Sequence, residues 1–317
     1  MRHPAFLAAA GMAAAMLSLA GPASAGMAGG SHLLPPANFA APVSVGRPVF
    51  MPTIELHNRL HRVKPPTGLL SYGGGPVLTV PHMYLILWDF GGLVRQGHSG
   101  DPDFIGKLMT AFAPVYGGTG YANIATQYYQ IVGGTTTYIS NPSSNASLWA
   151  DNKDKIPSHP TDSQVQAEAW EGVQHFNGGT PDPNGAYIVV SSYHHDPQGF
   201  LSSGWCAYHG ASSKNGNIIS YTNMPYMPDG GSSCGANFVS APSDELGVDE
   251  GFTIVLGHEY NESVTDPQPA SGWYNNSYGE IGDECAWTNI QNDPFGSNSF
   301  TMQPEYSNAS ASCVHSY

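Results

Sequence analysis

A short segment near residue 260 carries three side chains whose types and spacing suit metal chemistry. The segment, residues 257–267, reads GHEYNESVTDP. On an α-helix, His258 and Glu262 lie one turn apart on one face, and Glu259 is rotated by about 100° from His258. This spacing matches the His-Glu-x-x-His helix of zinc peptidases, with Glu262 in the place of the second histidine. We therefore expect His258 and Glu262 to bind a metal ion, and Glu259 to take a proton from the metal-bound water.

The metal at this pair is expected to be zinc, because zinc accepts carboxylate oxygen as well as imidazole nitrogen. A second anionic ligand lowers the charge on the ion and raises the relative affinity for manganese or iron. The alternative is a surface helix with a His–Glu ion pair, since this short pattern also arises by chance. Four apolar residues at helical spacing are predicted to form a core stripe on the opposite face of the helix: Phe252, Leu256, Tyr260 and Val264.

A third protein ligand is expected from the acidic segment that follows the helix. Glu280 lies 18 residues after Glu262, much like the separate carboxylate ligand of the thermolysin-type peptidases. Asp283 follows one short turn later, and we rank it second as a ligand, while Asp266 lies near the helix end. The alternative for this acidic cluster is a calcium loop, whose ligands are oxygen atoms, or a solvated turn.

Three histidines upstream are candidates to stabilise an oxyanion during hydrolysis. His194 and His195 follow a predicted buried strand, in the kind of loop that carries site residues. His209 lies in the segment CAYHG, residues 206–210. For each of the three, a structural role in the fold is the alternative.

The composition and the remaining motifs exclude several other classes of function. Ten basic against 24 acidic residues give a net charge of −14, which argues against nucleic acid and anionic membrane surfaces as partners. We expect no serine nucleophile on a strand-to-helix elbow, and the sequence has no phosphate-binding glycine loop ahead of a helix. A carbohydrate hydrolase with two carboxylates stays a weaker alternative, because the chain is rich in Trp and Tyr.

The N-terminus has the pattern of a secretory signal peptide. Arg2 and His3 precede an apolar run, and Ala-Ser-Ala at residues 23–25 forms a small-residue cleavage site. The run is shorter than the ~20 residues that span a bilayer. We therefore predict that residues 1–25 are removed, and that the mature protein is secreted, extracellular and not inserted in a membrane.

Export makes disulfides the expected state of the four cysteines. Three pairings are possible, and we favour the local one, Cys206–Cys234 with Cys285–Cys313, because it closes two similar loops. The cysteine spacing matches no four-cysteine zinc site.

The rest of the chain predicts a mixed fold. Residues 26–68 are rich in Gly, Pro and Ala, and we assign them to a flexible arm or pro-segment, with structure beginning near Leu69. Strands are expected within 77–90, 135–139, 186–190 and 218–222, and helices over 101–116, 161–176 and 251–264. Residues 69–317 are thus predicted to form a single disulfide-stapled α+β domain, with a mixed α/β sheet and a zincin-like active-site helix.

Several short segments together resemble the phosphate-induced protein 1 family, also called the Exordium-like family, of secreted plant and bacterial proteins. In order along the chain they are Leu70–Leu78, Tyr84–Trp88, Cys206–Gly210, Gly247–Asp249 and Val264–Pro267. The resemblance covers roughly residues 69 to 290 and is to the bacterial-type branch, with a metallopeptidase-like HExxE helix. It implies an exported protein associated with cell walls or the extracellular space, and supplies no catalytic mechanism.

These observations predict a secreted, metal-dependent, endopeptidase-like hydrolase that acts on an extracellular polypeptide or a cell-wall component. The alternative is a non-catalytic Exordium-like protein for extracellular or cell-wall binding or signalling, with acidic residues that are structural or bind calcium. His258 discriminates between the two, because a calcium site has no need of an imidazole ligand.

Overall fold

A mixed sheet forms the framework of the protein. The structure is a computed structural model, and it describes residues 41–60, 68–91, 111–143, 145–240, 245–277 and 279–317. Within these residues, six strands form one sheet in the order β1–β8–β9–β7–β3–β6. Their bounds are β1 Val43–Pro52, β3 His82–Trp88, β6 Ala146–Asp151, β7 Gly185–Ser191, β8 Trp205–Lys214 and β9 Asn217–Met224.

The two halves of the sheet differ in strand direction. β3 runs parallel to β6 and β7, and β7 runs parallel to β9. β8 is antiparallel to β9, and β1 is antiparallel to β8 at the edge. β7 has the sequence GAYIVVS and is buried along its whole length, as expected for a central parallel strand covered on both faces. The strands predicted at 186–190 and 218–222 are thereby confirmed.

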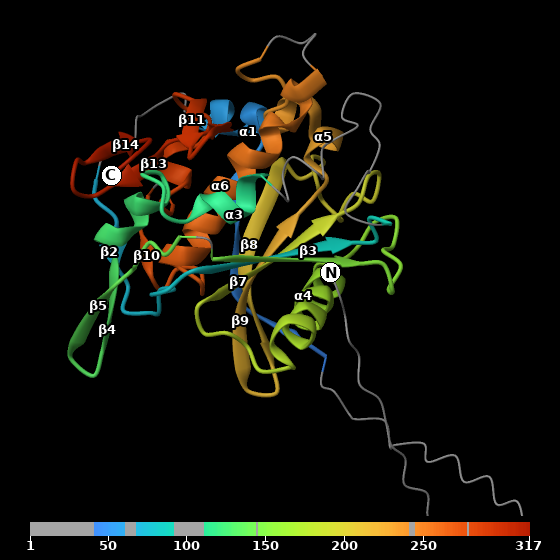
Figure 1. The fold of residues 1–317 in the computed structure, drawn as a ribbon, viewed down its shortest axis with the longest axis horizontal. Coiled ribbons are helices and arrows are strands. Elements are labelled where there is room, and N and C mark those ends of the chain that lie inside the picture. Colours follow the sequence, from blue (N-terminus) through green and yellow to red (C-terminus); the bar gives the residue numbers. More distant parts are fainter. Residues whose placement is uncertain (1–40, 61–67, 92–110, 144, 241–244, 278) are drawn as a thin grey trace, which may run out of the picture. The chain divides into compact units, whose positions relative to one another are not determined.

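Two long helices, α4 (Asp162–Asn177) and α6 (Glu250–Thr265), contact opposite faces of the sheet (Figure 1). Adjacent residues of β8 demonstrate this, because successive side chains of a strand point to opposite faces. The Tyr208 hydroxyl donates to Asp162 of α4 at 2.8 Å, whereas the His209 ring faces Glu262 of α6. A capping box formed by Thr161 and Gln164 begins α4. Both helices lie where the sequence predicted them.

Helix α6 is buried on all sides, and all 16 of its residues are buried. The expectation of one apolar and one polar face is therefore only half correct, because the polar face also lies in the interior. On the side away from the sheet, the Thr253 hydroxyl donates to the Thr301 carbonyl at 2.7 Å. Gly257 leaves room there for the side chains of Met302 and Tyr121.

Shorter elements complete the described part of the chain. The helical ones are α1 Ile54–Leu60, α3 Ala113–Tyr116, α5 Met227–Gly230, and the 3₁₀ turns η2 Ala122–Gln127, η3 Gly231–Cys234, η4 Glu245–Asp249 and η5 Asp283–Cys285. The paired short strands are β2 Ser71–Tyr72 with β10 Trp273–Tyr274, β4 Tyr129–Val132 with β5 Thr135–Tyr138, β11 Gln291–Phe295 with β12 Asn298–Met302, and β13 Glu305–Ser307 with β14 Ser312–Val314.

The expected start of structure near Leu69 is wrong. β1 and α1 lie within the segment assigned to a flexible arm, and β1 pairs with β8 from Val43 to Pro52. β1 contains a glycine and two prolines, which an edge strand tolerates because its outer N–H groups need no ladder partner. The register of β1 against β8 shifts between Val45 and Val49, where Gly46 and Pro48 lie, and again between Met51 and Pro52. The predicted signal peptide at 1–25 lies outside the described residues, as do residues 101–110 of the helix expected at 101–116.

The fold class and the disulfides are confirmed. The described residues between 41 and 317 form one compact α+β unit, stapled by Cys206–Cys234 and Cys285–Cys313. In the part of the chain that the structure describes, no helix is long and apolar enough to cross a bilayer.

Candidate metal centre

His258 and Glu262 face each other on α6 as their spacing predicts. Nε2 of His258 lies 3.2 Å from Oε1 of Glu262, and both side chains are fully buried. Two ligand atoms bound about 2.1 Å from one zinc ion at tetrahedral corners lie about 3.4 Å apart. The pair therefore has the separation of two ligands of a single metal ion.

Asp283 completes this group, and Glu280 belongs to a different one. Oδ1 of Asp283 lies 3.8 Å from Nε2 of His258, and donor atoms of His258, Glu262 and Asp283 all lie within 4.8 Å of one another. Donor atoms of His209, Glu262 and Glu280 form a second such group. From the sequence, Glu280 ranks first as the third ligand beside His258, whereas the geometry groups Asp283 with that histidine.

His209 reaches this centre from β8. Its Nδ1 lies 3.3 Å from Oε2 of Glu262 and 3.4 Å from Oε2 of Glu259. Its Nε2 lies 3.2 Å from the Asp266 carbonyl oxygen, and 3.5 Å from Oε2 of Glu280. His209 is thus in contact with three carboxylates and can serve as a metal ligand, a role that the sequence did not predict for it.

Two residues that the sequence analysis missed hold the His258 ring. The Gln303 amide nitrogen lies 2.9 Å from Nδ1 of His258, so Nε2 is directed at Glu262 and Asp283. Gly282 packs against the same ring, and a Cβ atom there would lie 2.6 Å from Nδ1. Partners that orient a ligand imidazole in this way are typical of metal sites. Neither residue belongs to a local motif, so the sequence carried no signal for them.

Glu259, the predicted general base, is buried against strand β1. Its Oε1 accepts a long hydrogen bond of 3.4 Å from the Met51 backbone N–H, and its side chain has no exposed surface. Oε2 has no hydrogen-bond partner among the described residues. One oxygen of Glu259 is therefore held by β1, and the other faces the centre.

The buried ion pairs of the centre shift the ionisation of its members. Burial acts to lower the pKa of His258, but Glu262 raises it to about 10. Burial acts to raise the pKa of Glu262, but His258 and His209 lower it to about 2. Burial raises the pKa of Asp283 to about 8, aided by Glu262, and raises that of Glu280 well above its usual range. The raised pKa values of His258, Asp283 and Glu280 mean that a divalent cation binding here would have to displace protons.

Several buried polar atoms of the centre have no hydrogen-bond partner among the described residues. They are Nδ1 of His209, Nε2 of His258, Oε2 of Glu259, Oε2 of Glu262 and both carboxylate oxygens of Glu280. Leaving such atoms unpaired in the interior costs free energy. Because they converge from three segments of the chain on one volume, the donor set is suited to a cation with nitrogen and oxygen ligands.

The other predicted residues have different partners. Asp266 closes the turn after α6, where its carboxylate accepts the Gly272 backbone N–H at 2.7 Å. The His194 ring is exposed and lies 3.5 Å from Asp229, and Nδ1 of His195 lies 3.0 Å from the Pro157 carbonyl oxygen. Neither His194 nor His195 belongs to the two groups of candidate ligands.

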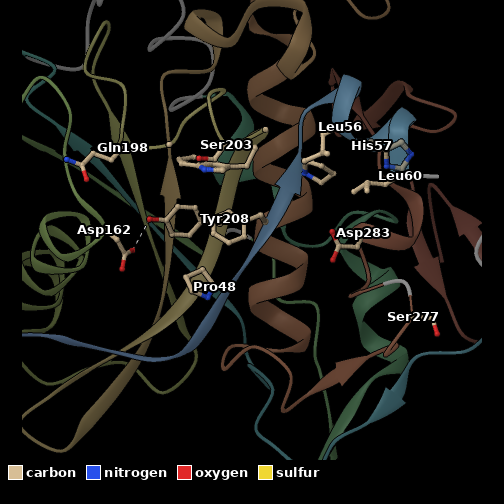
Figure 2. A pocket seen from close by; sticks show the side chains of 15 residues that line it. Pro48, Leu56, His57, Leu60, Asp162, Gln198, Ser203, Tyr208, Ser277 and Asp283 are labelled. Atoms are coloured by element: carbon tan, nitrogen blue, oxygen red, sulfur yellow. Dashed lines mark hydrogen bonds between the residues drawn. The ribbon is translucent and has the colours of Figure 1, made fainter. Parts of the chain in front are cut away.

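A groove of about 880 Å³ runs beside the centre. β1 and α1 contribute six of its lining residues, namely Pro48, Phe50, Pro52, Leu56, His57 and Leu60. Figure 2 shows β1 crossing in front of α6, with Asp283 on one side of the strand and Tyr208 on the other. Asp283 belongs both to the groove and to the His258 group, and so connects the buried centre with the surface.

Comparison with known proteins gives no relative. The chain matches no protein-family model, no curated protein and no solved structure. The function is therefore argued from the centre itself.

Proposed function

We propose that the protein is a secreted, metal-dependent hydrolase of the endopeptidase type, with zinc as the favoured metal and manganese or iron as alternatives. The observation that carries this proposal is the convergence of His258, Glu262 and Asp283 in the interior, with donor atoms within 4.8 Å of one another. A capped surface helix with one ion pair would have no need of a third acidic group from another segment.

The proposed roles follow from the positions of the side chains. His258, Glu262 and Asp283 would hold the metal ion. When bound, a zinc ion supplies a Lewis acid that polarises the scissile carbonyl and makes water more acidic. Glu259 neighbours His258 on the helix, and its Oε2, which has no hydrogen-bond partner among the described residues and lies 3.4 Å from Nδ1 of His209, would accept the proton of the attacking water. Gln303 would keep the His258 ring in its ligating orientation.

The groove supports a polymeric substrate. It is mostly lined by apolar and aromatic residues, and Asp283 connects it with the centre. An extracellular polypeptide is the substrate that we favour, and a cell-wall component is the alternative. The two disulfides and the signal-peptide pattern support export, as does the resemblance to the Exordium-like family.

The first test is elemental metal analysis of the purified mature protein, prepared without chelators, with His258→Ala beside it. The matched control is His159→Ala, which removes an exposed histidine. We expect bound zinc, manganese or iron in the wild type and the control, and its loss in His258→Ala. Calcium alone, or no metal in any of the proteins, would contradict the proposal.

The second test is hydrolysis of a fluorescent casein by the metal-loaded protein. Glu259→Gln should lower the rate by about 10²–10⁴-fold while the bound metal is retained. Glu171→Gln, which alters an exposed glutamate on α4, should leave the rate unchanged. Full activity of Glu259→Gln would show that Glu259 is not the general base.

One observation favours a second candidate, a non-catalytic extracellular or cell-wall binding protein. Glu259 has no exposed surface and is hydrogen-bonded to β1, so in this conformation no substrate reaches it. In such a protein the centre would be structural and the groove would bind the partner. Metal binding without hydrolysis of any polypeptide, combined with loss of folding in His258→Ala, would support this candidate.

A further inference from the structure

Glu262 directs one carboxylate oxygen to each of two buried histidines. Oε1 lies 3.2 Å from Nε2 of His258, and Oε2 lies 3.3 Å from Nδ1 of His209. The two histidines come from different elements, α6 and β8. A carboxylate placed in this way can bind one metal ion through each oxygen.

The His209 side has the features of a metal site of its own. The Asp266 carbonyl, 3.2 Å from Nε2 of His209, can accept its proton, which leaves a lone pair on Nδ1 that faces Glu262. A backbone carbonyl on the far nitrogen is a common way to orient a ligand histidine. Glu280 supplies the third member of the group, in which one donor atom from each of His209, Glu262 and Glu280 lies within 4.8 Å of the others, and its Oε2 lies 3.5 Å from Nε2 of His209.

The atoms on this side lack other partners. Nδ1 of His209, Oε2 of Glu262 and both carboxylate oxygens of Glu280 form no hydrogen bond with any described residue, and all three residues are at least 98% buried. A carboxylate in the interior is stable when it is paired or coordinates a metal. With a single ion at His258, the ionic partner that remains for Glu280 among the described residues is His209, whose Nε2 lies 3.5 Å from its Oε2.

We propose that Glu262 bridges two divalent cations, the first held by His258 and Asp283 and the second by His209 and Glu280. This inference deepens the proposed function and rests on it, because both sites share Glu262. In two-metal hydrolytic centres the ions lie about 3.5–4 Å apart, a span that the two oxygens of one carboxylate can bridge.

The charge of the centre favours two ions over one. Four carboxylates converge there, those of Glu259, Glu262, Glu280 and Asp283, and their ion pairs in the described residues run to the two histidines. In the deprotonated state that metal ligation requires, with neutral histidines, one divalent cation leaves two negative charges in the interior, whereas two cations balance all four. An uncompensated buried charge is strongly unfavourable.

The competing explanation is that His209 is an imidazolium ion that pairs with Glu259, Glu262 and Glu280 and binds no metal. The experiment that separates the two counts metal ions in the full mature chain after loading with Mn²⁺ or Zn²⁺ and removal of the excess. The proteins compared are the wild type, His209→Ala, Glu280→Gln, His258→Ala and the control His159→Ala.

We expect about two metal ions per chain in the wild type and in His159→Ala, and about one in His209→Ala and in Glu280→Gln. The Mn²⁺-loaded wild type should show the electron paramagnetic resonance signal of a spin-coupled pair, and Glu280→Gln should show that of an isolated ion. Glu280→Gln keeps the shape of the side chain, so it serves where His209→Ala fails to fold.

The failures of the two proposals are distinguishable. One ion per chain in the wild type, lost in His258→Ala and retained in Glu280→Gln, would overturn the bridged pair and leave the single-metal hydrolase standing. No bound ion in the wild type would overturn both.

Discussion

The backbone N–H of Met51 donates to Oε1 of Glu259 across 208 residues of sequence. This hydrogen bond joins edge strand β1 to the predicted general base on α6. It means that a segment assigned from the sequence to a flexible arm covers the side chain of Glu259. Access to Glu259 therefore depends on β1.

Replacing Met51 by proline tests this dependence, because proline has no N–H to donate. Met51→Ala is the matched control, since it removes the buried side chain and keeps the amide. We expect a strong chelator to remove the metal about three- to tenfold faster from Met51→Pro than from Met51→Ala, the loss of about one hydrogen bond. Equal rates in the two variants would show that this hydrogen bond does not control access.

Gly282 is a position where one added methyl group would disturb the centre. A Cβ atom there would lie 2.6 Å from Nδ1 of His258, so Gly282→Ala must displace the ring or its own loop. We expect the metal affinity to fall by at least about tenfold, as for loss of an orienting partner, in a titration against a chromogenic chelator. Ser277→Ala, an exposed change in the same segment, should bind as the wild type does, and wild-type affinity in Gly282→Ala would contradict the placement of His258.

The two disulfides allow a comparison at equal loop length. Each joins cysteines 28 residues apart, so removal of either should cost a similar ~3–4 kcal/mol in the free energy of unfolding. Cys285 lies two residues after Asp283 in a three-residue 3₁₀ turn, whereas Cys206 lies in β8, which the sheet holds. We therefore expect Cys285→Ser with Cys313→Ser to weaken metal binding more than Cys206→Ser with Cys234→Ser, as measured by chelator competition. The reverse order would show that the disulfide does not position Asp283.

Glu168 on α4 makes the stability depend on pH away from the centre. Burial, aided by Asp151, raises its pKa from 4.5 to about 9. The folded protein thus holds this proton more tightly than the unfolded chain does. The stability that the protonated group contributes is complete below about pH 4.5 and is lost as the pH rises toward 9.

Glu168→Gln removes this titration and keeps the shape of the side chain. From pH 5 to pH 8, the free energy of unfolding of the wild type should fall by more than ~1 kcal/mol relative to that of the variant. Each unit of pKa shift corresponds to about 1.4 kcal/mol. Urea unfolding of both proteins at the two pH values measures this difference. If the difference in free energy of unfolding between the two proteins is the same at pH 5 and pH 8, Glu168 ionises normally in the folded protein.

Much of the site could be predicted from the sequence where the signal is local. The spacing of His258 and Glu262 placed them face to face on one helix, because an α-helix brings residues i and i+4 together whatever surrounds it. The buried strand β7, the capped helix α4 and the local disulfide pairs were predictable for similar reasons. In each case, the decisive residues are close in the sequence or follow one period.

Three strands of the six-stranded sheet, β1, β6 and β8, were not predicted, and the sequences of β1 and β8 are atypical of strands. β8 carries polar residues at buried positions, and Ser212, for instance, accepts a hydrogen bond from Trp170 of α4. β1 contains a glycine and two prolines. Their strand conformation depends on partners in other parts of the chain, which periodicity does not reveal.

The sequence by itself determined the helix with His258, Glu259 and Glu262 and the mixed α+β class, and it favoured one of three possible disulfide pairings, the one that forms. The tertiary structure alone decided that His209 joins the centre, that Asp283 and Glu280 face different histidines, and that β1 lies over Glu259. The physical reason is the range of the interactions. Helical spacing acts within one turn, whereas the meeting of β1, β8, α6 and the segment after it depends on how the whole chain packs around one sheet.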